Sequence, residues 1–313
     1  MPGPPDTAQR SSSAHAGFTL VELLVVISII ALLIAILIPS MRHAREQGRS
    51  TLCLTRMHTL GQGVAMYALD HNDALLPSRM PNLGDGINWQ TEIAGGMKYR
   101  PTFIAMMGTY LNIPPFTHPS PVKSEVDPFG EKGDRQNYDD PTYTCPSVPT
   151  WTDERNGCFG WNFQFLGNSR LLDENDITSF KNWPVRTTHI KSPSGTVAVA
   201  DCTGTAASYA VKRSYDNNSK DPDRYGNEGF NLDPPRVDPV NGEMAEYDGS
   251  PQARTAVHDR HLGKAGVLWL DAHGTKSSAK ELGYDIMPDG VITFEGNNRY
   301  FSADGTDTAW VVD

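Results

Sequence analysis

Two histidines and an aspartate near the carboxy end of the chain are spaced so that they could share one ligand. Asp271 and His273 are two residues apart, so on a strand both side chains point to the same side, and a hairpin would return His261 beside them. Two nitrogens and one oxygen suit a transition metal. We favour the simpler interpretation that His261 and Asp271 hydrogen-bond across the hairpin and brace its shape.

Oxygen ligands of the kind that calcium prefers occur in three acidic tracts. They are residues 216–228, residues 285–289, and the pair Asp304 and Asp307. None of the three fits an EF-hand, because Leu232 stands where a loop beginning at Asp221 would need its closing glutamate. We therefore expect solvated loop acids and no cofactor, with calcium or a transition metal as the open alternatives.

The four cysteines lie far apart, and none belongs to a Cys-x-x-Cys pair; they are Cys53, Cys145, Cys158 and Cys202. A zinc knuckle is therefore not expected. In an exported domain four cysteines allow two disulfides in three connectivities, and burial as thiols is equally compatible with the sequence. The sequence lacks the nucleophile elbow, the phosphate loop, the His-Glu-x-x-His motif and the dinucleotide fingerprint, so we do not expect an enzyme.

The elements that must position these residues begin with an apolar run over residues 23–38, broken only by Ser28. As a helix, residues 18–39 would be about 33 Å long, which is enough to cross a bilayer core of about 30 Å. Glu22 is the only charged residue in that stretch. A carboxylate costs roughly 2.5–3.5 kcal/mol near the bilayer centre and less toward an end, so Glu22 needs a partner or a purpose.

The residues that open this run, Gly17-Phe18-Thr19-Leu20-Val21-Glu22, resemble the processing signal of type IV prepilins and type II secretion pseudopilins. The resemblance implies that a prepilin peptidase cuts between Gly17 and Phe18 and methylates the new amino terminus. It also implies that Glu22 is the fifth mature residue and that Pro39 interrupts the helix, as a proline does in many pilins. An ordinary secretory signal fits less well, because Arg10 is the only lysine or arginine before the apolar run and no small-residue cleavage site follows the run.

A second resemblance lies at the carboxy end, where prepilin-like proteins abundant in planctomycetes have a histidine, nine residues and Asp-Gly. Here His261 and Asp271 fit, and Ala272 stands in place of the glycine. Because alanine resists positive φ, we expect the turn to shift onto His273 and Gly274. Other pieces of the same resemblance are Cys53 with Leu60-Gly61-Gln62 and Tyr67, the stretch Tyr143-Thr144-Cys145-Pro146-Ser147, and residues 190–197 leading to Asp201.

We expect four segments: a leader over residues 1–17, a membrane and assembly helix over 18–39, its amphipathic continuation over 40–76, and a globular head over 77–313. The continuation should bury one stripe against the head, because Cys53, Met57, Leu60, Val64 and Tyr67 recur with helical spacing. Residues 102–111 are a candidate for a brief element within a stretch that otherwise reads as loops, and strand signals lie at residues 159–166, 196–200, 266–270 and 291–294. The resemblance implies an α+β fold, with an antiparallel sheet packed on the second half of the helix.

The function that the resemblance implies is that of a structural subunit of a type IV pilus-like filament or a type II secretion pseudopilus. The chain would cross the cell inner membrane once, with its head outside the cytoplasm. Its partners would be the prepilin peptidase, homologous pilin or pseudopilin subunits, and the inner-membrane assembly machinery. In the filament, Glu22 would pair with the amino group of Phe18 on a neighbouring subunit.

Two further expectations concern partners. Nucleic acid is not expected, because 27 lysines and arginines stand against 37 aspartates and glutamates, a net charge of −10 that repels phosphate. The alternative function is a membrane-tethered binding protein that recognises polysaccharide or a secreted substrate and never polymerises. Exposed tryptophans clustered in a groove would favour that alternative; the candidates are Trp151, Trp161, Trp183 and Trp310.

Overall fold

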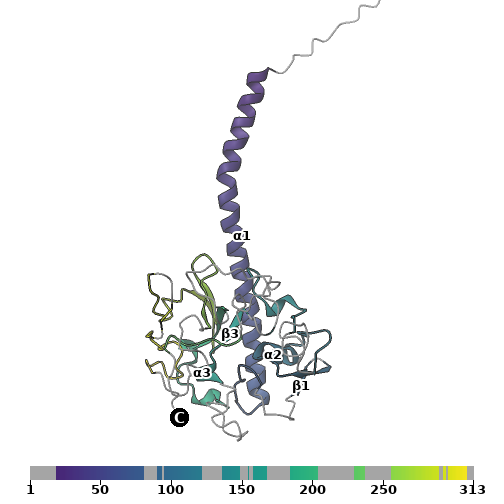
Figure 1. Ribbon diagram of the computed structural model, residues 1–313, viewed down its shortest axis with the longest axis vertical. Coiled ribbons are helices and arrows are strands. Elements are labelled where there is room, and N and C mark those ends of the chain that lie inside the picture. Colours follow the sequence, from purple (N-terminus) through teal and green to yellow (C-terminus); the bar gives the residue numbers. More distant parts are fainter. Residues whose placement is uncertain are drawn as a thin grey trace, which may run out of the picture. The chain divides into compact units, whose positions relative to one another are not determined.

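The structure is a computed structural model in which the chain forms two compact units, Met1–Arg45 and Glu46–Asp313. The described residues are 19–80, 90–93, 95–121, 136–148, 154, 158–167, 184–203, 229–236, 255–288, 292–293 and 295–308. One helix, α1 (Leu20–Asp70), supplies most of the described part of the first unit and continues into the second (Figure 1).

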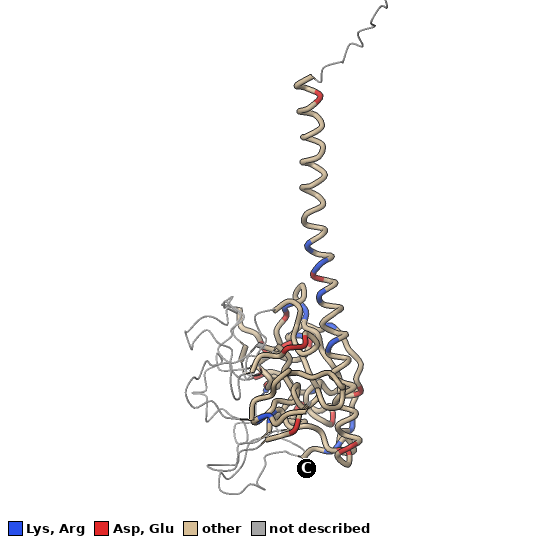
Figure 2. The backbone as a smooth tube through the Cα atoms, turned by 90° about the vertical axis from the view of Figure 1, so that its right-hand side faces the viewer, with Lys and Arg blue, Asp and Glu red and all other residues tan. Residues whose placement is uncertain are grey.

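Helix α1 runs through Pro39 without a break, so the expected interruption at this residue is wrong. Proline removes one backbone hydrogen bond, but its fixed φ is itself helical, and the apolar helix continues on both sides of it. Glu22 is the one charged residue of residues 20–41, and a charged segment with Arg42, Arg45 and Arg49 follows. Figure 2 shows this as a long tan stretch of the helix, below which blue and red positions begin. The helix ends at Asp70, before the end predicted at residue 76. Just after it, Asn72 and Asp73 adopt positive φ, which stops the helix.

The predicted apolar stripe of α1 is confirmed, because all five of its side chains are buried: Cys53, Met57, Leu60, Val64 and Tyr67. Two glycines lie beside this stripe and let other elements approach closely. A Cβ atom at Gly61 would come within 3.1 Å of Leu268, and one at Gly63 within 2.9 Å of Met107. The second half of α1 therefore packs against a β-hairpin on one side and a short helix on the other.

The short helix is α2 (Phe103–Leu111), which lies where the sequence indicated a brief element of unassigned type over residues 102–111. Its buried residues face the core, and Asn112 closes its end in the left-handed conformation. Before it, β1 (Gln90–Ile93) and β2 (Gly96–Tyr99) pair antiparallel as a separate hairpin. Lys98 of β2 is fully buried and forms an ion pair of 2.6 Å with Glu154.

The main sheet is antiparallel and has five strands: β3 (Phe159–Trp161), β4 (Val197–Thr203), β5 (Ala256–Val257), β6 (Ala265–Trp269) and β7 (Gly274–Ser277). Its order is β3-β4-β6-β7, and β5 also pairs with β4. The strands expected over residues 196–200 and 266–270 are confirmed as β4 and β6. The strand expected over 159–166 is half wrong, because after β3 the chain turns into the helix α3 (Phe163–Leu166). Of residues 291–294, Ile292 forms an isolated bridge with Ile286, and residues 291 and 294 lie outside the described ranges.

Both faces of the sheet are covered, which explains why β6 is apolar throughout and why β4 is apolar apart from Asp201 and Thr203. One core cluster joins the stripe of α1 to Val199 of β4, Leu268 of β6 and Trp161 of β3. A second cluster, on Val197, Val267 and other sheet residues, contains side chains from the carboxy-terminal segment such as Phe301. Three short 3₁₀ helices connect these elements: η1 (Pro141–Tyr143), η2 (Thr187–His189) and η3 (Pro193–Gly195). The head is thus the α+β fold with an antiparallel sheet that the sequence predicts.

Candidate functional site

The first candidate site is the start of α1, where Thr19 and Glu22 cap the helix reciprocally. The backbone N–H and the hydroxyl of Thr19 donate to Oε2 of Glu22 at 2.8 Å and 2.7 Å, and the N–H of Glu22 lies 3.2 Å from the Thr19 hydroxyl oxygen. This is a capping box, in which two unpaired helical N–H groups are satisfied by side chains. Glu22 therefore has a partner in its own chain. The predicted scissile residues Gly17 and Phe18 lie outside the described residues.

The surface of α1 in the first unit is apolar all round. Each leucine, isoleucine and valine of residues 20–38 is between 46% and 79% exposed. Among the described residues, α1 is the one helix long and apolar enough to cross a membrane. A contiguous apolar surface of this length calls for an apolar environment that covers it.

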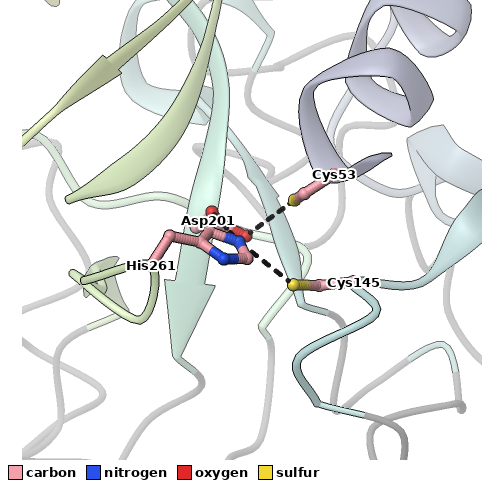
Figure 3. Close-up of side chains that lie close together, drawn as sticks. All are labelled: Cys53, Cys145, Asp201 and His261. Carbon is pink, nitrogen blue, oxygen red and sulfur yellow. Dashed lines mark hydrogen bonds and ion pairs between the residues drawn. The ribbon is translucent and has the colours of Figure 1, made fainter. Parts of the chain in front are cut away.

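The second candidate site is a buried cluster inside the head, formed by Cys53, Cys145, Asp201 and His261 (Figure 3). The four side chains come from four separate parts of the chain. Cys53 is on α1, Cys145 follows η1, Asp201 is on β4, and His261 is in the turn before β6. All four are buried, and their sulfur, oxygen and nitrogen atoms lie within 4.8 Å of one another. They are the only such group of metal-binding side chains in the part of the chain that the structure describes.

Three distances define the cluster. Sγ of Cys53 is 3.4 Å from Oδ1 of Asp201, and Sγ of Cys145 is 3.5 Å from Nε2 of His261. The same Nε2 atom is 3.2 Å from Oδ2 of Asp201. Because Gly266 has no side chain, its backbone N–H reaches Oδ2 of Asp201 at 2.7 Å, and a Cβ atom at Gly266 would crowd that oxygen at 3.1 Å.

His261 is held from both sides. Its Nδ1 atom is 3.1 Å from Oε1 of Glu46, which also accepts a hydrogen bond of 2.7 Å from the hydroxyl of Ser147. Its backbone is fixed by a tight turn, in which the N–H of His261 donates to the carbonyl of Lys264 at 2.8 Å. The two central residues, Leu262 and Gly263, have φ values of 57° and 80°, as a primed hairpin turn requires.

Cys145 and Asp201 are also fixed by contacts from neighbouring segments. Arg56 of α1 donates to the carbonyl of Thr144 at 2.8 Å, and the N–H of Cys145 lies 2.8 Å from Sγ of Cys158. Arg260 donates to the backbone carbonyl of Cys202 and lies 3.6 Å from Oδ1 of Asp201. The cluster therefore sits in a framework of hydrogen bonds that does not depend on solvent.

The electrostatics favour charged groups in the cluster despite its burial. Burial raises the pKa of Asp201, but the guanidinium of Arg260 and the hydrogen bond from His261 outweigh it and lower that pKa. Burial lowers the pKa of His261, but its bonds to Asp201 and Cys145 raise it to about 10. Burial likewise raises the pKa of the Cys145 thiol, and hydrogen bonds from Cys53 and His261 lower it to about 6. A carboxylate, a protonated imidazole ring and a thiol of lowered pKa thus meet in one buried site.

The structure brings together only two of the three residues predicted to form the carboxy-terminal motif site. Nδ1 of His273 is 2.5 Å from Oδ1 of Asp271, and both side chains are about 40% exposed on the turn between β6 and β7. His261 does not contact Asp271, because its ring nitrogens face Glu46, Asp201 and Cys145. The brace expected between His261 and Asp271 does not form here.

The turn itself differs from the expectation that it would shift onto His273 and Gly274. Ala272 adopts φ +69° and keeps the position that a glycine would occupy. The hairpin is closed by the N–H of Trp269 to the carbonyl of His273 at 2.9 Å, and Trp269 stacks on the His273 ring at 5.5 Å. The register of β6 and β7 therefore holds the turn, and Ala272 accepts the strained conformation.

The remaining predicted ligands are not gathered in the described residues. Residues 216–228 and residue 289 lie outside them. Asp304 accepts from its own loop at Thr306, and Asp307 pairs with Arg236 at 2.9 Å. No disulfide joins the four cysteines, all of which are described and buried. Sequence reasoning did not predict the buried cluster, because its members are separated by dozens of residues and only the fold brings them together.

Comparison with known proteins bears on the first site. Residues 12–38 match the family described as "Prokaryotic N-terminal methylation motif". The chain is also similar to the type IV wide pilus major component PilA4 of Thermus thermophilus, with 43% identity over 56 residues, which is 18% of this chain and 43% of that protein. The match thus spans less than half of the relative's length. No solved structure matches the chain. The amino-terminal part of the chain is prepilin-like.

Proposed function

We propose that the chain is a structural subunit, without enzymatic activity, of a type IV pilus-like filament or a type II secretion pseudopilus. In this proposal a prepilin peptidase cuts between Gly17 and Phe18, and the mature chain assembles through α1. The observation that carries the proposal is the exposed apolar surface of residues 20–38, which directly overlaps the match to the methylation motif over residues 12–38. A helix of that kind serves as a membrane anchor first and as a packing surface afterwards.

In this proposal the subunit is first inserted into the cell inner membrane. Residues 20–38 are long enough to cross the hydrocarbon core, and lipid would cover their apolar side chains. The head would lie outside the cytoplasm. On assembly, helices of homologous subunits replace the lipid, with help from the inner-membrane assembly machinery. The relative's description as a pilus major component supports this kind of partner.

Glu22 has a specific task in this proposal. Cleavage after Gly17 would place a new amino group on Phe18, in front of the capping box. A carboxylate and an amino group that meet in an apolar core neutralise each other, whereas either one alone is costly there. We therefore assign Glu22 to pair with the amino group of Phe18 on a neighbouring subunit, which would set the register between helices.

The alternative function, a tethered protein that binds polysaccharide or a secreted substrate, has less support. Trp161, one of the tryptophans that could have formed an exposed groove, is fully buried against Phe103 in the core. The other candidates, Trp151, Trp183 and Trp310, lie outside the described residues. The exposed apolar helix serves both functions, so the test must ask whether the chain polymerises.

The test is to shear filaments from cells that express the full chain, image them, and identify their subunits by mass spectrometry. We expect filaments that contain this chain beginning at a methylated Phe18. The Gly17→Asp variant should stay uncut in the membrane and be absent from the sheared fraction, whereas Gly3→Asp, in the same leader, should be processed normally.

Two results would count against the proposal in different ways. An amino terminus at Met1, or one beyond Pro39, would reject processing at Gly17. A correctly processed chain that remains monomeric in the membrane under chemical cross-linking, while the cell makes filaments without it, would reject assembly and favour the tethered binding protein.

A further inference from the structure

The buried cluster of Cys53, Cys145, Asp201 and His261 has a composition that the proposed function does not explain. A filament subunit needs an apolar helix and a stable head, and neither requires two thiols, a carboxylate and an imidazole to converge. In the described residues all four side chains are buried, and three of them come from segments other than α1. Burial of so many polar groups at one point is costly unless they gain something from being together.

We propose that this cluster is a structural zinc site, with Cys53, Cys145, Asp201 and His261 as its four ligands. The inference does not depend on whether the chain forms filaments, because it rests on the geometry of the head alone.

The distances between the ligand atoms fit a tetrahedral ion. Zinc binds sulfur at about 2.3 Å and nitrogen or oxygen at about 2.0–2.2 Å, so the edges of its coordination tetrahedron are roughly 3.3–3.8 Å long. The separations are 3.4 Å from Sγ of Cys53 to Oδ1 of Asp201, 3.5 Å from Sγ of Cys145 to Nε2 of His261, and 3.2 Å from that Nε2 to the other carboxylate oxygen, Oδ2 of Asp201. No ligand pair is farther apart than 4.8 Å, so small side-chain shifts would close the tetrahedron.

The groups around the ligands also match those of a zinc site. A zinc-bound histidine generally donates its second ring nitrogen to a carboxylate or carbonyl, which fixes the tautomer. Here Nδ1 of His261 faces Glu46 at 3.1 Å, which leaves Nε2 for the ion. The N–H of Gly266 holds one oxygen of Asp201 at 2.7 Å and so orients the carboxylate.

The ligand set favours zinc over harder cations, and a structural role over a catalytic one. Two sulfurs with an imidazole are soft ligands that calcium and magnesium avoid. Four protein ligands without solvent access leave no open position for a substrate or a water molecule, which is the arrangement of a structural site. The ion would link α1 to β4 and to the turn before β6, and so would stabilise the packing of the helix on the sheet.

The test uses the full chain in detergent, purified with a reductant and without chelator. After addition of zinc chloride and exhaustive buffer exchange, we expect one zinc per chain by elemental mass spectrometry. Cobalt in place of zinc should give the intense visible absorption of a tetrahedral site and a sulfur-to-cobalt charge-transfer band. Thermal unfolding should move to higher temperature with zinc and return with chelator.

Variants separate this site from adventitious binding. Cys53→Ser and Cys145→Ser should each lose the stoichiometric ion and the charge-transfer intensity. The matched control is Cys202→Ser, which changes a buried thiol outside the cluster that donates to the carbonyl of Asn231, and it should keep both. Glu46→Gln leaves all four ligands in place and should weaken zinc binding by about 10–100-fold.

Four results would overturn the proposal. The first is a reduced wild-type chain that retains no zinc, and the second is equal retention by the two cysteine variants and the wild type. The third is a disulfide between Cys53 and Cys145 in chain taken from its native membrane, found in unreduced peptides after thiols have been blocked. An octahedral cobalt spectrum would also reject the tetrahedral set.

Discussion

The carboxylate of Glu22 accepts two hydrogen bonds from Thr19 within its own helix, and the proposed assembly asks it also to pair with a neighbour's amino group. Three variants separate these roles. Glu22→Val should still insert into the membrane, because it removes a charge from an apolar segment, but it should assemble poorly. Thr19→Ala loses the cap, which is worth about 1 kcal/mol, yet keeps the carboxylate and should yield filaments at close to the wild-type level. Glu22→Gln should resemble Glu22→Val. The measurement is the amount of chain in sheared filaments relative to the membrane.

If Thr19→Ala reduces filament yield as strongly as Glu22→Val, the carboxylate acts through the helix cap and the pairing between subunits is not needed. The spacing Thr19-x-x-Glu22 is also the sequence signature of a capping box. The same glutamate therefore fits both a helix cap and the processing signal that the surrounding residues resemble.

Ala272 is strained at a position that glycine occupies without cost. Its φ of +69° lies in the left-handed region, where a side chain costs roughly 1–2 kcal/mol. Ala272→Gly should therefore stabilise the chain by about 0.5–1 kcal/mol, after part of the gain is offset by the greater conformational freedom of glycine in the unfolded chain. Urea unfolding of the chain in detergent would measure it. The control is Ala265→Gly, a buried position in β6 that should lose stability; an equal loss for Ala272→Gly would show that the turn is not strained.

Among the elements, the contact between α1 and the β6–β7 hairpin depends on the absence of a side chain at Gly61. A Cβ atom there would lie 3.1 Å from Leu268 and 3.2 Å from Ala272. Gly61→Leu should therefore destabilise the head by about 1–3 kcal/mol through overpacking. Gly48→Leu is the matched control on the same helix, because nothing lies within 4 Å of a Cβ atom at that position. It should be stabilising by up to about 1 kcal/mol, since leucine favours helix over glycine.

The midpoint of thermal unfolding, measured for both variants under the same conditions, checks this pair. A Gly61→Leu chain as stable as Gly48→Leu would mean that the hairpin does not pack closely on the helix.

The elements that the sequence predicted well are those with a period or a long apolar run. Helical spacing from Cys53 to Tyr67 identified the buried face of α1, and the apolar runs around Val199 and Val267 identified β4 and β6. The helix α3 was missed because four residues are too few to show a helical period. The buried cluster could not be found in this way, since its ligands share no local spacing and are joined only by the sheet order β4-β6 and the position of α1. The residue types indicated a site at His261, but only the fold shows that its neighbours there are Cys53, Cys145 and Asp201.

At the scale of the whole molecule, the division at Arg45 separates an apolar helical unit from the head. Among the described residues the buried core begins only at Ser50, so residues 19–45 supply none of it. A chain that starts at Arg42 should therefore be soluble without detergent and unfold cooperatively, at the same temperature as the full chain. Calorimetry with size-exclusion chromatography would measure both properties.

A chain that starts at Ser50 is the control for this truncation, because it also lacks Glu46. Without Glu46, Nδ1 of His261 loses the carboxylate at 3.1 Å and keeps the Ser147 hydroxyl at 3.4 Å, so the loss of this contact with a charged group should cost about 1–3 kcal/mol. If the chain from Arg42 aggregates or unfolds without cooperativity, the apolar unit contributes to the stability of the head. The two units would then not fold independently.

The continuity of α1 also has a mechanical consequence. A pulling force applied to the apolar part of the helix is carried along its backbone to residue 46, the first residue of the second unit. There Glu46 contacts His261, and two helical turns later Cys53 contacts Asp201, so the cluster is the first junction through which tension passes from the helix into β4. In a fibre that is stretched at the cell surface, the strength of this junction would decide whether a subunit stays folded under load, even where it adds little to the stability of the molecule at rest.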